Sequence, residues 1–453
     1  MTTMILLIMG IILDVIYAAG LVVASPVWLY RMIRHGRYRS GLGEKFGAAP
    51  IRYGLQPVIW IHAVSLGEIN ACRALVAQIH SQLPDYRVAI STTTDTGMAA
   101  ARKLFAPDHW VFFYPLDFTW SVARALGRIR PSLIVLMEGD VWPNFLAACN
   151  RRDIPVAVVN ARMSANKGYP RYKKLGAIAR NLIFKRLAAV GVQDETYLQR
   201  FVELGTPADR VHLTGMLKYD SAQVADKLPG QEALAAAVGL AAGETLIVAG
   251  GTGEGEEQIV LDAFGQVRAK CPAARLAIVP RKPERFDEVA RLIESHNLPL
   301  VRRSQRPDGS SAASSPGAVI LGDTMGELRK FYALAACVFV GRSLVPDGGS
   351  DMIEAAALGK PTCFGPHTFN FPQADDLASH GCVRVADGAA LAQQLIAWLA
   401  DPAAATAAAQ SAQQYVRTQQ GATQRNVQML CRVLGRTPAI VPGAIATDKI
   451  MTA

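Results

Sequence analysis

Short apolar runs alternate with helical patterns along most of this 453-residue chain. Each run has the length of a buried strand, and apolar residues at helical spacing follow most of them. The runs cover residues 58–64, 88–91, 133–137, 156–160, 189–192, 246–249, 276–279, 319–321, 337–340 and 361–364. This alternation predicts an α/β protein with parallel, doubly wound sheets.

The chain is longer than one hydrophobic core usually supports, so we expect two similar-sized Rossmann-like domains with a cleft between them. Their boundaries are placed at residues 31–217 and 218–437. Residues 438–453 lack periodicity and are predicted to form a flexible tail. A stretch rich in Ala, Gln and Leu at 389–409 predicts a surface helix.

Residues 1–30 predict a membrane anchor. Between residues 4 and 30 the only charged residue is Asp14, and this length could span a hydrocarbon core of about 30 Å. Basic residues follow between Arg31 and Lys45, which predicts cytoplasmic domains and contact with anionic lipid. Two alternatives stay open: a helix lying in the membrane interface, and a signal peptide, although residues 1–4 lack its basic segment.

Composition narrows the function classes. A hydrophobic content of 51% with 19% charged residues describes a well-packed globular protein. The net charge of +10 is unevenly spread and includes the basic segment behind the apolar N-terminus, for which we expect a membrane surface and no nucleic acid as partner. Seven scattered cysteines without a C-x-x-C pair suit a reducing compartment and offer no zinc spacing.

Glu68 is the first candidate catalytic residue. It follows the run at 58–64 on the turn Ser65-Leu-Gly-Glu68, which opens a helical pattern. In open α/β sheets, ligands bind at the carboxyl ends of the strands, so this carboxylate could act as a general base. The same four residues also fit a capping box, in which the glutamate reaches back to the start of the helix.

Other polar groups follow later strands. Glu138 and Asp140 end the run at 133–137, and Lys218 lies close to the domain boundary. In the second half, three segments after predicted strands supply arginine, glycine or carboxylate groups, as a nucleotide-sugar site would require. They are Pro280-Arg281, Met325-Gly326-Glu327 and Gly348-Gly-Ser350-Asp351-Met-Ile-Glu354. Helix capping and solvated charge would explain each segment without a ligand.

Taken in order from about residue 26 to residue 376, these blocks resemble the 3-deoxy-D-manno-octulosonic acid (Kdo) transferases. The resemblance implies a two-domain GT-B fold, attachment to the cytoplasmic side of the inner membrane, and transfer from CMP-Kdo to a lipid A precursor without metal or cofactor. It implies Glu68 as the catalytic base, with Glu138 and Lys218 stabilising the transition state. It also implies that CMP contacts Pro280, Arg281, Met325, Gly326, Glu327, Ser350, Asp351 and Glu354.

Several residues depart from the family pattern. Gly139-Asp140 replaces Thr-Glu, Gly253 and Lys282 replace histidines, and Ser350-Asp351 replaces His-Asn. Asp351 would repel an anionic donor, and we expect Arg342, at a position where the family has glycine, to compensate.

We therefore predict an inverting, metal-independent Kdo transferase. The alternatives are a related transferase with another donor or acceptor, and an inactive homologue that binds glycolipid.

Overall fold

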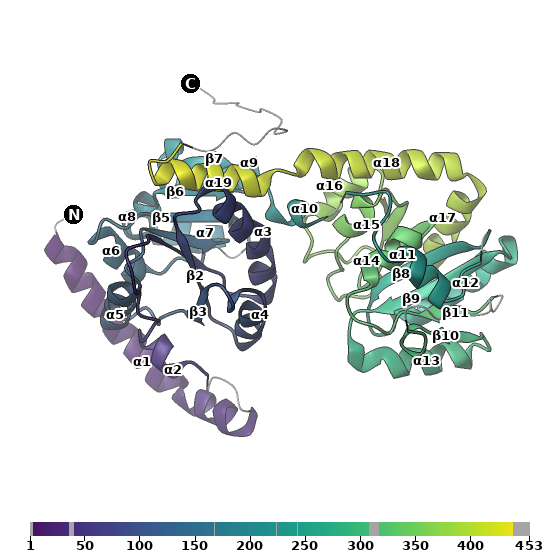
Figure 1. Ribbon diagram of the computed structural model, residues 1–453, viewed down its shortest axis with the longest axis horizontal. Helices are drawn as coiled ribbons and strands as arrows, with labels where there is room; N and C mark the ends of the chain where they lie inside the picture. Colours follow the sequence, from purple (N-terminus) through teal and green to yellow (C-terminus); the bar gives the residue numbers. More distant parts are fainter. Residues whose placement is uncertain are drawn as a thin grey trace. The chain divides into compact units, whose positions relative to one another are not determined.

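The computed structural model describes residues 3–35, 40–166, 168–222, 224–241, 243–307 and 317–437. The chain divides into two compact units (Figure 1). Unit 1 contains the residues up to Ser221 together with those from Gln420 onward, and unit 2 contains Ala222–Gln419. Residues 438–453, predicted to be a tail, lie outside the described part of the chain.

Unit 1 is built on a seven-stranded sheet in the order β3-β2-β1-β4-β5-β6-β7, with parallel neighbours throughout. The strand order reverses between β1 and β4, which places the topological switch point of a doubly wound sheet there. The strands are β1 (Val58–His62), β2 (Arg87–Thr92), β3 (Trp110–Phe113), β4 (Leu133–Met137), β5 (Val156–Ala161), β6 (Ala189–Val192) and β7 (Val211–Leu213).

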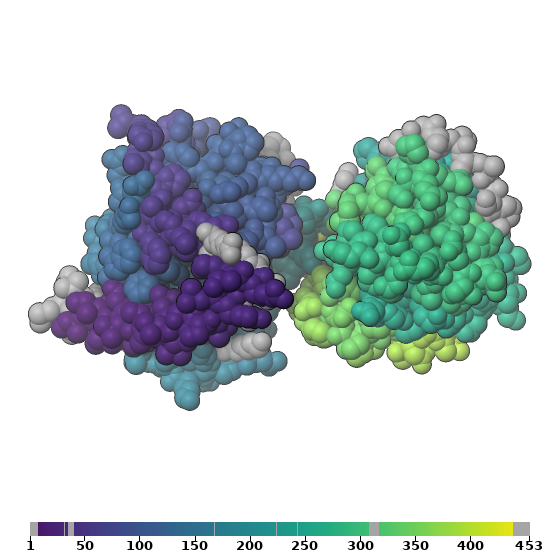
Figure 2. Space-filling view, turned by 90° about the horizontal axis from the view of Figure 1, so that it is seen from below, coloured from purple at the N-terminus to yellow at the C-terminus, as the bar shows by residue number. Residues whose placement is uncertain are grey.

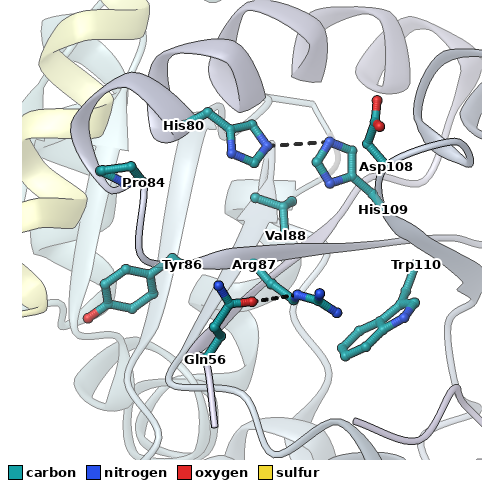
Figure 3. Close-up of a pocket in the computed structure, with 9 residues that line it drawn as sticks. All are labelled: Gln56, His80, Pro84, Tyr86, Arg87, Val88, Asp108, His109 and Trp110. Carbon is teal, nitrogen blue, oxygen red and sulfur yellow. Dashed lines mark hydrogen bonds between the residues drawn. The ribbon is translucent and has the colours of Figure 1, made fainter. Parts of the chain in front are cut away.

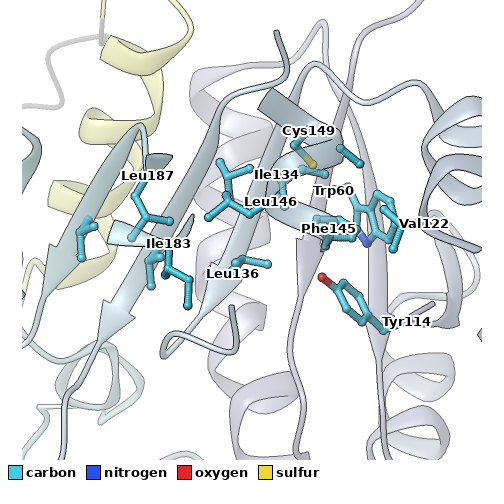
Figure 4. Close-up of a cluster of buried hydrophobic side chains, with 14 of the residues drawn as sticks. Trp60, Tyr114, Val122, Ile134, Leu136, Phe145, Leu146, Cys149, Ile183 and Leu187 are labelled. Carbon is cyan, nitrogen blue, oxygen red and sulfur yellow. The ribbon is translucent and has the colours of Figure 1, made fainter. Parts of the chain in front are cut away.

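Helices cover both faces of this sheet because alternate strand residues point to opposite sides. Trp60, Ile134 and Leu136 pack with α5, α6, α8 and α9, whereas Ile59 and Ile61 pack with α3, α4 and α19 (Figures 1 and 4). The helices are α1 (Thr3–His35), α2 (Leu42–Lys45), α3 (Leu66–Gln82), α4 (Asp95–Phe105), α5 (Thr119–Ile129), α6 (Pro143–Asn150), α7 (Gly168–Leu175), α8 (Ala177–Leu182), α9 (Glu195–Leu204), α10 (Leu217–Ser221) and α19 (Ala422–Val433).

Unit 2 repeats the plan with a second parallel sheet in the order β10-β11-β9-β8-β12-β13-β14. Its switch point lies between β8 and β12. The strands are β8 (Thr245–Thr252), β9 (Ala274–Pro280), β10 (Leu300–Arg302), β11 (Val319–Leu321), β12 (Cys337–Val340), β13 (Thr362–Phe364) and β14 (Val383–Arg384). The helices are α11 (Gln231–Ala237), α12 (Glu256–Lys270), α13 (Phe286–Ser295), α14 (Leu328–Leu334), α15 (Ile353–Ala357), α16 (Gln373–Ser379), α17 (Gly388–Ala400) and α18 (Pro402–Gln419). Two doubly wound domains confirm the predicted fold class.

The chain returns to unit 1 at its end, which differs from the boundaries drawn from the sequence. Val427 and Leu430 of α19 are buried in the core beside α3, and the Asp220 carboxylate accepts the N–H of Gly421 (2.7 Å). Asn426 lies so close to β6 that a Cβ on Gly191 would come within 2.3 Å of its Oδ1 atom. Residues 420–437 therefore belong with unit 1, and not with the second domain as placed from the sequence.

The predicted surface helix at 389–409 is wrong in two respects. The chain breaks at Asp401, and Pro402 begins a second helix, α18. Proline lacks an N–H and fits the first turn of a helix, which explains the break. Leu391, Leu395 and Trp398 of α17 are buried in the unit 2 core, so only part of this segment faces solvent.

Helix α1 is long and apolar enough to cross a membrane by length and composition. Within unit 1 it lies along the body of the domain beside α5 and α6 (Figures 1 and 2).

Candidate functional site

In unit 1 the candidate residues gather at the carboxyl ends of β1 and β4, the two strands at the switch point. His62 pairs with Leu136 across these strands, so the turns that follow them lie side by side. The turn after β1 carries Glu68, and the turn after β4 carries Glu138 and Asp140. This is the edge of a doubly wound sheet at which ligands bind.

Glu68 forms the capping box in this structure. The Ser65 Oγ atom accepts the Glu68 N–H (3.4 Å) and donates to Oε1 (2.9 Å), while the Val64 N–H donates to Oε2 (2.9 Å). Burial raises the pKa of Glu68 and the charge of Glu138 adds to this effect, whereas the hydrogen bonds from Val64 and Ser65 oppose it. A raised carboxyl pKa suits a general base, but capping and catalysis compete for the same side chain.

Glu138 is held by backbone conformation and by cations. Its φ of 57° is in the left-handed region, and Gly139 follows with a φ of 110°. The Arg162 Nε atom lies 2.7 Å from Glu138 Oε2. Burial raises the pKa of Glu138, and the charges of Arg162 and Lys218 oppose that rise. The structure thus brings together Glu68, Glu138 and Lys218, the three residues to which catalytic roles were assigned.

His62 adds a buried imidazole to this edge. Its Nδ1 atom lies 3.0 Å from Ser91 Oγ, and its ring stacks on Tyr114 at 3.7 Å between centroids. Its Nε2 atom faces the Asp140 carboxylate at 3.5 Å. Burial acts to raise the pKa of Asp140, but His62 and Trp142 lower it overall. Tyr114 was missed from the sequence, although the aromatic run that leads to it signals a strand.

A hollow of about 290 Å³ lies elsewhere in unit 1, at the amino ends of β2 and β3 (Figure 3). It is lined by Arg87 and Trp110 and by His80 and His109, whose Nε2 atoms are 3.4 Å apart. Because ligands of doubly wound sheets bind at the opposite ends of the strands, this hollow is not the candidate site.

In unit 2 the loops after β8 and β12 are joined by one buried carboxylate. Glu256 is fully buried and accepts backbone N–H groups from Gly253 (3.2 Å), Ser343 (2.9 Å) and Leu344 (2.9 Å), and from Arg342 (2.5 Å). Four donors on one carboxylate fix both loops at the switch point. The sequence did not reveal this role, because three of the four partners are backbone amides 86–88 residues away.

The glycine-rich segment before α15 comes close to the loop after β8. The Ser350 hydroxyl donates to the Gly251 carbonyl (2.8 Å), and Gly348 and Gly349 have φ values of 85° and 88°. Asp351 caps α15 by accepting the N–H of Ile353 (3.0 Å). Helix α15 begins at Ile353, so Ser350 and Asp351 precede it.

Three of the predicted nucleotide contacts surround Tyr332. Burial raises the pKa of this tyrosine well above its usual value; the charges of Glu354 and Asp351 add to the rise, and Arg281 opposes it. The Tyr332 hydroxyl has no hydrogen-bond partner among the residues that the structure describes. Arg281 is exposed directly after Pro280, the last residue of β9, and its N–H donates to Thr252 (3.1 Å). These side chains therefore gather at one edge of the sheet.

The segment Met325-Gly326-Glu327 is arranged differently from the expectation. Glu327 forms a bidentate ion pair with Arg303, with 2.9 and 3.0 Å between the paired atoms. Burial acts against ionisation, but the hydrogen bonds from Arg303 and Thr324 lower the pKa of Glu327 overall. Gly326 has a φ of 86°, and Met325 is 66% exposed. Glu327 therefore holds this turn in place, whereas Met325 points toward solvent.

The charge compensation expected of Arg342 takes another form. Its Nε atom lies 3.6 Å from Asp347 Oδ2, and its Nη2 atom donates to the Asp347 carbonyl (2.9 Å). In the part of the chain that the structure describes, Arg342 thus forms its ion pair with Asp347. Its φ of 58° shows why the family glycine is structurally convenient at this position.

Comparison with known proteins places these features in a family. The sequence profile described as 3-deoxy-D-manno-octulosonic-acid transferase (kdotransferase) matches residues 40–221. A 3-deoxy-D-manno-octulosonic acid transferase of Bordetella pertussis is 35% identical over 437 residues, covering 91% of this chain and 97% of the relative. The chain belongs to the Kdo transferase family. A second member, from Haemophilus influenzae, is 32% identical over 369 residues, covering 79% of this chain and 83% of that protein.

The two-unit fold agrees with this membership. The structure of a glycosyltransferase from Rickettsia africae is similar to this one, with a TM-score of 0.56 and 13% sequence identity. The match covers 84% of this chain and 99% of the Rickettsia protein. At that identity the likeness shows the GT-B fold alone. The chain is therefore a glycosyltransferase by family and has the GT-B fold.

Proposed function

We propose that this protein transfers Kdo from CMP-Kdo to a lipid A precursor at the cytoplasmic face of the inner membrane. The observation that carries the proposal is the 35% identity with a Kdo transferase over 91% of the chain. The carboxylates at the unit 1 switch point and the arginine and glycine loops at the unit 2 switch point support it, because acceptor activation and phosphate binding require these groups.

In the proposed reaction Glu68 takes the proton of an acceptor hydroxyl. The hydroxyl oxygen bonds to the anomeric carbon of Kdo, and the bond between that carbon and the phosphate oxygen breaks, so that CMP leaves with the electron pair. Lys218 and Arg281 offset negative charge on the sugar carboxylate and the departing phosphate. Inversion follows from a single displacement.

Glu68 can serve as base only if it leaves the capping box. Glu68→Gln removes the base and keeps a side chain of the same size, whereas Ser65→Ala removes the capping hydroxyl and keeps the carboxylate. We expect Glu68→Gln to lower kcat by about a hundredfold to ten-thousandfold. Ser65→Ala should lower stability by about 1 kcal/mol and retain most of kcat.

The test measures transfer from CMP-Kdo to lipid IVA by both variants, with unfolding curves as the control for folding. Equal losses of activity and stability in the two variants would mean that Glu68 is only a helix cap. Transfer from a different nucleotide sugar, with none from CMP-Kdo, would favour a divergent donor and would point to Asp351, which replaces the family asparagine.

A further inference from the structure

The single acid of α1, Asp14, is bonded to the body of unit 1. Its Oδ1 atom accepts the N–H of Thr119 (2.9 Å) and the Nδ2 of Asn144 (3.0 Å), and its Oδ2 atom accepts the Thr119 hydroxyl (2.5 Å). These donors lie at the first turns of α5 and α6. The carboxylate that the sequence places inside an apolar segment is therefore satisfied by the protein and not left in hydrocarbon.

Two further residues on the same face of α1 complete the contact. Tyr17, one turn beyond Asp14, donates its hydroxyl to Asp117 (3.2 Å), and its ring meets those of Phe118 and Trp142 edge-on at 6.2 and 6.3 Å. Gly10, one turn before Asp14, lies so close that a Cβ would come within 3.0 Å of the Thr119 methyl group. Positions 10, 14 and 17 share one helix face, so α1 is docked along two turns.

The opposite face of α1 is apolar and open. Ile11, Val15, Val22, Val23 and Ile33 are 55%, 64%, 71%, 81% and 75% exposed. Such a stripe on a soluble surface marks an interaction site. In the space-filling view α1 lies along the surface of unit 1 (Figure 2), and the exposed fractions of these five residues show that the rest of the described chain leaves them uncovered.

We propose that α1 lies flat on the membrane, docked to unit 1 through Asp14 and Tyr17, and does not cross the bilayer. If α1 crossed the bilayer and both domains were cytoplasmic, the basic C-terminal end of α1 would lie beside unit 1. The first residues of α1 would then lie on the far side of the membrane. Asp14 lies 17 residues before Arg31, or about 26 Å along a helix, close to the full depth of a core of about 30 Å. Thr119 belongs to the body of unit 1 and could not bond Asp14 at that depth. The docking of α1 on unit 1 and a crossing of the bilayer by α1 therefore exclude each other.

The partner of the open face is lipid. Next to the docked helix, the exposed Trp120 stacks between Phe46 (5.7 Å) and Phe118 (6.0 Å), and Trp142 is 40% exposed. Aromatic rings of this kind favour the headgroup level of a bilayer. Arg34 of α1 and Arg124 of α5 are also exposed, which suits anionic headgroups.

This surface reaches the candidate site. The Trp142 indole N–H donates to Asp140 Oδ2 (3.2 Å), and Asp140 lies at the carboxyl end of β4. A docked α1 would therefore hold the unit 1 site against the membrane surface. This part of the inference rests on the proposed function, because it assumes an acceptor carried by lipid.

The topology test uses the full chain with one epitope at each end, in sealed spheroplasts and in inside-out inner-membrane vesicles. Protease added outside spheroplasts should leave both epitopes intact, and protease added to inside-out vesicles should remove both. Removal of the N-terminal epitope from outside, with the C-terminal epitope protected, would overturn the proposal. Transfer from CMP-Kdo is measured in the same membranes. If the protein is active and its N-terminus lies outside, the flat helix is rejected and the proposed function stands. If the protein is inactive and both termini lie in the cytoplasm, the proposed function is rejected and the flat helix stands.

A matched pair of variants tests the docking. Asp14→Leu removes the three hydrogen bonds, and Val15→Leu changes the adjacent exposed residue. We expect backbone hydrogen exchange at Thr119, whose N–H donates to Asp14, to accelerate by about tenfold or more in the first variant and to stay unchanged in the second. Equal exchange in both variants would overturn the docking. Failure of the full chain to bind vesicles of phosphatidylethanolamine and phosphatidylglycerol, with formation of a dimer, would overturn lipid as the partner.

Discussion

The buried carboxyl group of Asp117 should make the stability of unit 1 depend on pH. Its carboxylate accepts the backbone N–H groups of Asn144 (3.0 Å) and Phe145 (2.7 Å) at the start of α6 and the hydroxyl of Tyr17 (3.2 Å). Burial raises its pKa from 3.8 to about 7, against the lowering effect of these hydrogen bonds. The folded protein therefore retains a proton that the unfolded chain releases.

The sign and size follow from linkage. Because the folded pKa is the higher one, the stabilisation is fully present below the unfolded value of 3.8 and is lost as the pH rises through about 7. Between about pH 5 and pH 8 the free energy of unfolding should fall by about 3 kcal/mol from this group. Above about pH 8 the contribution should be flat.

Tryptophan fluorescence in urea measures this, since five of the six tryptophans precede Ser221. Asp117→Asn is the control, because it removes the titrating group and keeps its size. Between about pH 5 and pH 7 the unfolding free energy should fall more steeply with pH in the wild-type protein than in Asp117→Asn. The difference in slope should correspond to the release of about one proton on unfolding. Equal slopes in the two proteins would refute the reasoning.

Two further predictions concern packing. Glu256→Gln turns an amide NH₂ toward backbone N–H donors and should lower the unfolding free energy of unit 2 by about 3 kcal/mol. The fluorescence of Trp398 reports this unfolding, and a loss under about 1 kcal/mol would contradict the four-donor arrangement. Gly191→Ala should lower the free energy of unfolding of unit 1 by about 2 kcal/mol, because its Cβ meets Asn426. Adding Asn426→Ala to that variant should restore part of the loss, and no restoration would show that α19 is not the obstacle.

Much of the architecture could be predicted from apolar runs alone. The run at 133–137 became β4 without change, because a strand buried on both faces has no polar position to obscure it. The strand β3 was missed, although its residues are aromatic. The return of α19 to unit 1 could not be predicted, because an apolar helix face fits either sheet. Tertiary contacts such as the close approach of Gly191 and Asn426 and the bond from Gly421 to Asp220 select one.

The parts of the candidate site that belong to a sequence motif could be predicted. The parts that depend on backbone hydrogen bonds or backbone conformation could not. Glu68 and Glu138 were named from their places after strands, and Lys218 from its place near the domain boundary; the structure brings the three together. Glu256 escaped notice because its partners are amides of a distant loop. The pairing of Arg342 with Asp347 depends on a left-handed backbone conformation, which charge patterns do not reveal.

Product analysis by mass spectrometry tests the central claim most directly. The full chain in membranes is incubated with CMP-Kdo and lipid IVA, beside the Glu68→Gln variant. Kdo transfer predicts a glycolipid heavier by one or more Kdo residues, formed by the wild-type protein and nearly absent with the variant. An unchanged lipid IVA mass with CMP-Kdo, under conditions where another nucleotide sugar is consumed, would contradict the proposed function.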